Sequence, residues 1–171
     1  MEEILIVDGY NIIHASPELS GLIDEELAHA RLKLVSDIGQ YKSMKGFSQA
    51  IIVFDAHLVR EGSGSLFNED GVEVVFTQEG QKADTLIERL VAKLSGEKRV
   101  YVATSDWQEQ RTVLGYGAIR LSARELLDDL RYVREKSLQE HSCSGKHGER
   151  HLAWRLKGET LNILEKLRRK K

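Results

Sequence analysis

Residues 4–11, Ile4-Leu5-Ile6-Val7-Asp8-Gly9-Tyr10-Asn11, give the strongest indication of how this chain folds. Its first four residues form an uninterrupted apolar run rich in β-branched side chains, which is typical of a strand buried on both faces of a parallel sheet. Comparable runs lie at residues 50–54, 72–76 and 100–103, and a shorter candidate lies at residues 118–121. The chain is therefore expected to build a mainly parallel sheet of about five strands.

Helical patterns separate these strands. Apolar residues repeat at helical spacing over residues 24–44 and 82–94. A further helix is expected after Asp106, and Ser122-Ala-Arg-Glu125 opens another with a capping-box sequence. Strand and helix thus alternate, which predicts a three-layer α/β/α fold with right-handed crossovers. The exception is residues 56–71, a polar, glycine-containing stretch that we expect to be a loop.

The composition fits one folded domain. A length of 171 residues with 41% hydrophobic and 30% charged residues is neither disordered nor collagen-like. No apolar run approaches the roughly 20 residues that cross a bilayer, and the first residues lack the pattern of a signal peptide. The single cysteine, Cys143, excludes an internal disulfide and agrees with a reducing compartment. We expect a cytoplasmic protein with no membrane partner.

Charge is divided unevenly along the chain. Residues 146–171 hold nine lysines and arginines against three glutamates, so a tail of net charge +6 follows a body of −8. This division is typical of proteins that meet nucleic acid, although the end of a solvated helix also collects basic residues. We predict a main domain at 1–140, a linker at 141–150 and a basic C-terminal helix at 151–171. Its residues Arg168, Arg169 and Lys170 are candidate RNA contacts.

Four aspartates follow the predicted strands. Asp8, Asp55 and Asp106 come directly after the first, second and fourth strands, and Asp84 lies in the first turn of the helix after the third. The carboxyl ends of parallel strands meet at one edge, where such sheets bind ligands. Carboxylates that meet there repel one another unless a cation lies among them. Oxygen ligands favour Mg²⁺ or Mn²⁺, ions that assist phosphodiester hydrolysis.

Each of these acids also has a structural interpretation, because aspartate is a favoured helix N-cap. The functional interpretation rests on the joint pattern, since independent caps need not share one edge of the sheet. Asn11, Thr104 and Ser105 are candidate supporting residues, which either hold a ligand or fix the neighbouring turns. The chain has no G-x-G-x-x-G motif, no P-loop and no serine nucleophile elbow.

Other polar and aromatic residues have open roles. Tyr10 is either a base-stacking residue or part of the core, and Arg120 and Arg124 either contact phosphates or pair with nearby acids. His57 is a phosphate-orienting candidate or a solvated loop residue. A histidine- and cysteine-containing segment at residues 141–151 matches no strong structural-zinc spacing.

Taken in order, the motifs Val7-Asp-Gly-Tyr-Asn11, Val53-Phe-Asp-Ala-His57, Ala83-Asp84, Ala103-Thr-Ser-Asp106 and Ser122-Ala-Arg-Glu-Leu126 resemble those of a known family. The chain is similar to the YacP-like NYN-domain proteins, a branch of the PIN-like ribonucleases. The resemblance implies a PIN-like, Rossmann-like fold and a metal-dependent endoribonuclease that cuts mRNA on bacterial ribosomes. It also implies that Asp8, Asp55, Asp84 and Asp106 bind the metal.

The predicted function is therefore a metal-dependent endoribonuclease that acts on RNA, with mRNA, rRNA and the ribosome as expected partners and Mg²⁺ or Mn²⁺ as cofactor. Relatives often have threonine before the Ala-Asp pair and an acid after it, whereas this chain has Lys82 and Thr85. These departures support one alternative, a non-catalytic RNA- or ribosome-binding module of the same fold. A small-molecule phosphohydrolase is the other alternative.

Overall fold

The computed structural model describes residues 1–21, 23–56 and 66–139. The chain divides into two units, Met1–Val133 and Arg134–Lys171. The first unit contains the whole sheet and the helices that cover it. The predicted linker at 141–150, the predicted basic helix at 151–171 and the segment 57–65 lie outside the described residues.

A six-stranded sheet in the order β3-β4-β2-β1-β5-β6 forms the centre of the first unit. Its strands are β1 (Glu3–Asp8), β2 (Gln49–Phe54), β3 (Leu66–Glu69), β4 (Val72–Phe76), β5 (Arg99–Thr104) and β6 (Ile119–Ser122). All neighbouring pairs are parallel except β3 with β4. The expected α/β fold with a mainly parallel sheet is confirmed.

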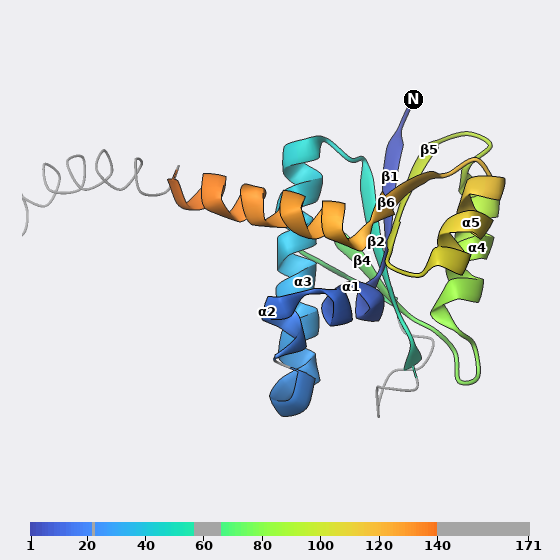
Figure 1. Cartoon of the computed structure of the whole chain (residues 1–171). Coiled ribbons are helices and arrows are strands. Elements are labelled where there is room, and N and C mark those ends of the chain that lie inside the picture. The colour runs from blue at the N-terminus through green and yellow to red at the C-terminus, as the bar shows by residue number, and fades with distance from the viewer. Residues whose placement is uncertain (22, 57–65, 140–171) are drawn as a thin grey trace, which may run out of the picture. The chain divides into compact units, whose positions relative to one another are not determined.

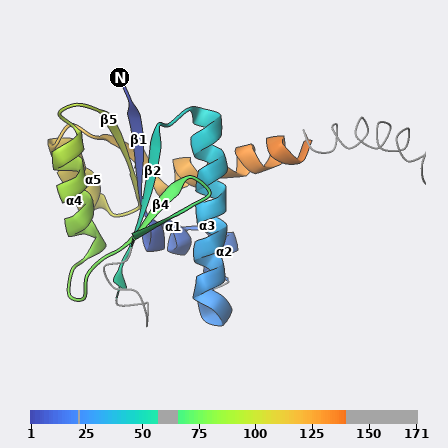
Figure 2. The ribbon, with the colours of Figure 1, turned by 180° about the vertical axis from the view of Figure 1, so that it is seen from behind.

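Helices cover both faces of this sheet. One face carries α1 (Gly9–Ala15), α2 (Pro17–Ser20) and α3 (Ile23–Lys45), and the other carries α4 (Ala83–Leu94) and α5 (Trp107–Gly115), as Figures 1 and 2 show from opposite sides. The last helix of the described residues occupies residues 123–139, and its part up to residue 133 belongs to the first unit. Among the described residues, none of these helices combines the length and the apolar character that a membrane crossing requires.

The alternation of side chains along β1 explains the two helical layers. Successive residues of a strand point to opposite faces. Leu5 and Val7 pack into the core beneath α1 and α3, whereas Ile4 and Ile6 pack into the core beneath α4 and α5. Asp8 has the parity of Ile4 and Ile6, so the strand directs its carboxylate toward the α4 and α5 side. All four apolar side chains are fully buried.

One local prediction was wrong. The expected loop at 56–71 contains β3, which pairs with β4 through a two-residue turn at Asp70 and Gly71, both with positive φ. An Asp-Gly pair between strands is the usual signal for such a hairpin, but β3 is short and polar and lacks an apolar run. The sheet therefore has six strands where about five were predicted.

Candidate active site

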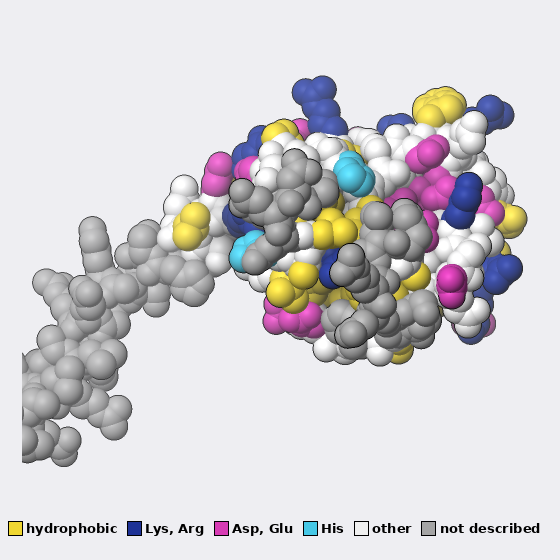
Figure 3. Space-filling model, turned by 90° about the horizontal axis from the view of Figure 1, so that it is seen from below, with side chains coloured by type: hydrophobic (Ala, Val, Ile, Leu, Met, Phe, Trp, Pro, Cys, Tyr) yellow, Lys and Arg dark blue, Asp and Glu magenta, His cyan; other side chains and the backbone are white. Residues whose placement is uncertain are grey.

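The candidate site lies at the edge where the parallel strands end. Strands β2 and β4 continue from one side of β1 and strands β5 and β6 lie on its other side. Strand order thus reverses at β1, and ligands of open α/β sheets bind at this reversal. Figure 3 shows this edge, with acidic side chains gathered on the side of α4 and α5.

Asp8 occupies the centre of that edge. It is the N-cap of α1, and the Asn11 backbone N–H donates to its Oδ1 over 3.1 Å. The following residue must be small, because a Cβ added to Gly9 would lie 2.2 Å from the Phe54 ring. The Phe54 ring is itself fully buried, so it packs directly on the backbone beside Asp8 and holds the Asp8 side chain at the strand end.

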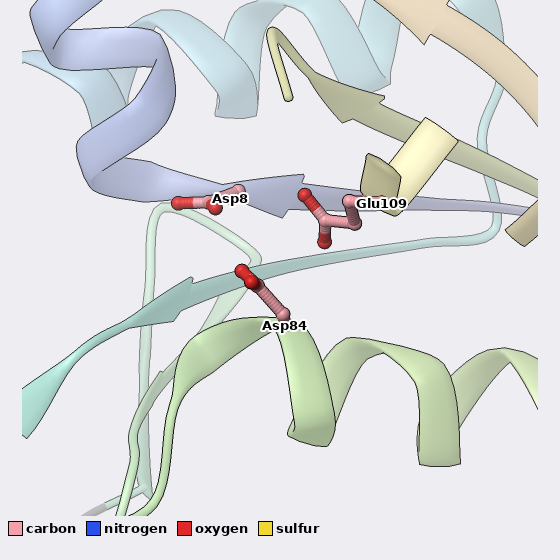
Figure 4. Close-up of side chains that lie close together, drawn as sticks. All are labelled: Asp8, Asp84 and Glu109. Atoms are coloured by element: carbon pink, nitrogen blue, oxygen red, sulfur yellow. The ribbon is translucent and has the colours of Figure 1, made fainter. Parts of the chain in front are cut away.

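Two further carboxylates meet Asp8. Asp84 comes from the first turn of α4, and Glu109 comes from the first turn of α5. One ligand oxygen of each residue lies within 4.8 Å of the other two. In Figure 4 the three side chains, brought from β1, α4 and α5, point toward one another. We call Asp8, Asp84 and Glu109 the acidic cluster.

The acidic cluster is unfavourable for negative charge unless a cation is present. The pKa of Glu109 is raised to about 8, mainly by burial, against a smaller opposing effect of the Thr104 hydroxyl and with added repulsion from Asp8, Asp84 and Asp106. The pKa of Asp8 is raised to about 6, again mainly by burial, with added repulsion from Asp84 and Asp55. Buried carboxylates crowded in this way favour protonation.

The donors present fit a hard divalent cation. Both carboxylate oxygens of Glu109 are buried, and within the described residues neither makes a hydrogen bond of ordinary geometry. No lysine or arginine in the described parts of the chain forms an ion pair with a member of the acidic cluster. Three carboxylates without sulfur or imidazole among them suit Mg²⁺ or Mn²⁺ better than Zn²⁺.

The structure places the other two predicted acids beside the acidic cluster rather than in it. The Thr77 hydroxyl donates to Asp55 Oδ1 over 3.3 Å and accepts the Ala56 backbone N–H over 2.9 Å. Asp106 is the N-cap of α5, and its Oδ1 accepts the backbone N–H groups of Gln108 and Glu109. Both remain close enough for their charges to act on the cluster, Asp55 on Asp8 and Asp106 on Glu109.

The three predicted supporting residues connect the loops around the cluster. Asn11 Oδ1 accepts both the backbone N–H of Ser105, over 3.0 Å, and the Ser105 hydroxyl. Thr104 is fully buried, and its Oγ1 accepts the backbone N–H of Asp106 over 3.1 Å. These bonds tie the start of α1 to the start of α5, and so fix Asp8 relative to Glu109.

The candidate RNA contacts have varied positions. Tyr10 is 6% exposed and packs edge-on against Phe54, which favours its interpretation as a core residue. Arg120 donates to Gln110 Oε1 over 3.0 Å, and the exposed Arg124 lies 4.0 Å from Asp128. Outside the described residues lie His57, the segment at 141–151 and the basic residues Arg168, Arg169 and Lys170.

Sequence reasoning missed Glu109. The predicted acid after β5 was Asp106, which caps α5, and the prediction did not include Glu109 in the first turn of the same helix. Its signal is the helical register of α5, because Glu109 precedes the buried Val113 by four residues and shares its face. A glutamate on the apolar face of a helix, one turn from the ligand-binding edge of a sheet, indicates a buried functional carboxylate.

Comparisons with known proteins find one family model and several relatives that match this chain. A family model for the YacP-like NYN domain matches residues 5–169. The chain is 42% identical over 135 residues to the uncharacterized protein YacP of Bacillus subtilis (strain 168), a match that covers 78% of each. The crystal structure of Rae1 (YacP) from Bacillus subtilis is similar over 98% of this chain and 95% of that one, at 38% identity and a TM-score of 0.70. A mutant of Rae1 matches over 78% and 77%, at 40% identity and a TM-score of 0.65.

Proposed function

Since the chain belongs to the YacP-like NYN domain family, whose members are PIN-like nucleases, we propose that it is a divalent-metal-dependent endoribonuclease. Family membership supports a nuclease-type, RNA-related function. The proposal adds that Mg²⁺ or Mn²⁺ is required and that the substrate is mRNA on or near the ribosome, in the cytoplasm. The basic residues 146–171 are the proposed docking segment for RNA of the translating complex.

The convergence of Asp8, Asp84 and Glu109 is the observation that carries the proposal. Their ligand oxygens come within 4.8 Å of one another from three separate elements, without a basic partner among the described residues. A fold gains nothing from gathering three uncompensated acids, because burial and repulsion both disfavour their charges. A cation-binding role accounts for this cost.

Within this proposal each residue has a distinct task. Asp8, Asp84 and Glu109 would hold the ion, which when bound neutralises a phosphodiester oxygen and activates a water for attack. Asn11 fixes the spacing of Asp8 and Glu109 through Ser105. We retain Asp55 and Asp106 as outer acids, whose charges strengthen the negative potential that attracts the ion.

The test measures cleavage and metal binding on the same proteins. The full chain would be incubated with end-labelled single-stranded RNA, with and without ribosomes, in Mn²⁺ or in EDTA. Asp84→Asn should abolish cleavage and the Mn²⁺-induced rise in unfolding temperature while the fold is retained. Glu97→Gln is the matched control, because the exposed Glu97 lies beyond the opposite end of α4, and it should behave as the unmodified protein.

The outcomes separate the proposed function from its competitors. Cleavage that persists in EDTA or in Asp84→Asn contradicts the metal-dependent mechanism. An unmodified protein that binds RNA but neither cleaves it nor responds to millimolar Mn²⁺ is a non-catalytic RNA-binding module. Hydrolysis of nucleotides or sugar phosphates without cleavage of RNA identifies a small-molecule phosphohydrolase.

A further inference from the structure

The guanidinium of Arg31 is held by neutral aromatic side chains. Its Nη1 donates to the Tyr10 hydroxyl over 3.0 Å, and its guanidinium lies 5.7 Å from the centroid of the Phe76 ring. No carboxylate of the described residues lies within ion-pair distance of it. A half-buried guanidinium held by neutral groups keeps most of its five donors available for an anion.

The residues that hold Arg31 place it at the candidate active site. Tyr10 follows the end of β1 and Phe76 ends β4, the two strands on either side of β2, so the guanidinium lies over the carboxyl ends of this part of the sheet. Between them Phe54 ends β2, with ring centroids 5.0 Å from Tyr10 and 5.5 Å from Phe76. These three aromatic side chains form a platform beneath Arg31.

The platform and the acidic cluster occupy opposite sides of the same sheet edge. Arg31 comes from α3, and the platform belongs to the core on the α1 and α3 face. Asp84 and Glu109 come from α4 and α5, which cover the other face. A strand of RNA that crosses the edge of the sheet therefore meets carboxylates on one side and a fixed guanidinium on the other.

The separation of Arg31 from the acidic cluster bears on how the site can bind the negatively charged RNA backbone. The acidic cluster repels a phosphodiester until a cation is present, and the outer acids Asp55 and Asp106 extend that repulsion. The charges of Arg31 and Asp55 both act on the Tyr10 hydroxyl. Burial raises the pKa of this hydroxyl, the hydrogen bond and charge of Arg31 oppose that rise, and the charge of Asp55 adds to it. A fixed positive charge beside the acids offsets their repulsion of the RNA backbone.

We propose that Arg31, positioned by the Tyr10 hydroxyl and the Phe76 ring, binds a backbone phosphate of the RNA next to the one that is cleaved. The inference rests on the proposed function, because it takes RNA as the substrate. The planar guanidinium fork matches two phosphate oxygens. Arg31 thereby sets where the strand lies relative to the acidic cluster.

The test uses RNA binding, which can be measured without cleavage. Fluorescein-labelled single-stranded RNA would be titrated with the full chain carrying Asp84→Asn, alone and combined with Arg31→Met, over a series of salt concentrations. Arg31→Met keeps an apolar side chain over Phe76 and removes the charge. Loss of one phosphate contact should weaken binding about tenfold and reduce the slope of log K against log salt by about 0.7.

Two further variants distinguish the effect of the guanidinium geometry from the effect of its charge. Arg31→Lys should restore the salt slope but not the full affinity, because an ammonium keeps the charge and loses the fork. Tyr10→Phe keeps the ring and removes the hydroxyl, so it should weaken binding without a change of slope, and it provides a test if Arg31→Met fails to fold. Arg89→Met, at an exposed position of α4, is the matched control and should leave the slope unchanged.

The results distinguish the inference from the proposed function. Unchanged affinity and slope in Arg31→Met, or an equal loss in Arg89→Met, overturns the role of Arg31 even if the unmodified protein cleaves RNA. If Arg31→Met does not fold, unchanged affinity in Tyr10→Phe overturns it. An unmodified protein that fails to cleave RNA contradicts the proposed function, while the binding measurements still decide for or against Arg31.

Discussion

Replacement of Glu109 by glutamine should make the metal-free protein more stable at neutral pH. Glu109 is 3% exposed and its pKa is raised to about 8, whereas an unfolded glutamate titrates near 4.5. The fold therefore prefers the protonated form. The contribution of Glu109 to the free energy of unfolding is fully present below the unfolded pKa of 4.5. It is lost as the pH rises from there toward the folded pKa of about 8.

The size of the effect depends on the interval between the two pKa values. Each pH unit across it costs about 1.4 kcal/mol for one group. Between pH 4.5 and pH 7 the free energy of unfolding of the unmodified protein should therefore fall by about 3 kcal/mol more than that of Glu109→Gln. For a domain of this size this difference corresponds to roughly 10 °C in unfolding temperature. At pH 4.5 the protonated glutamate resembles glutamine, so the two proteins should differ little.

The assay is thermal or urea unfolding in EDTA at several pH values between 4.5 and 8.5. The quantity compared is the change with pH, because a fixed packing difference between the two side chains cancels in it. The exposed Glu97→Gln serves as control and should follow the unmodified protein. If the unfolding of Glu109→Gln and of the unmodified protein depends on pH in the same way, Glu109 is not a buried carboxyl with a raised pKa.

Adding Mn²⁺ should stabilise the unmodified protein more than it stabilises Glu109→Gln. A bound cation favours the carboxylate form and stabilises the folded state in proportion to its affinity. The unmodified protein should therefore gain more from Mn²⁺ at pH 8 than Glu109→Gln does. An equal gain in both proteins would show that the ion binds elsewhere.

Three further substitutions test how the edge of the sheet is built. Gly9→Ala should destabilise the fold by about 1–3 kcal/mol in urea unfolding, because the new methyl group meets the fully buried Phe54 ring; an unchanged midpoint would contradict this packing. Thr77→Val should cost about 1–3 kcal/mol, since it leaves the buried Ala56 N–H without its acceptor, and a neutral result would mean that another acceptor replaces it. Asp106→Ser should keep the stability of α5, because serine also caps helices; RNA cleavage that survives this change identifies Asp106 as a cap alone, whereas lost cleavage with retained stability assigns it to the ion.

Two of the four acids that the sequence predicts lie in the acidic cluster, and the other two lie beside it. Asp8 and Asp84 were identified from their places after a strand and in a first helical turn, and the structure brings them together. Asp55 and Asp106 were identified in the same way but make local hydrogen bonds beside the cluster. Position along the chain identifies which edge a side chain reaches, whereas its rotamer and its neighbours determine which partner it meets.

The amino-acid sequence was enough to predict the alternation of strands and helices, because apolar runs and helical spacing are local properties that reflect burial. It also determined that acids would follow the strands at one edge. Two features could not be predicted from the sequence: Glu109 completes the acidic cluster, and Arg31 lies across the edge of the sheet on an aromatic platform. Both depend on how α5 and α3 pack against the sheet, and such contacts between distant segments are set by the assembled core.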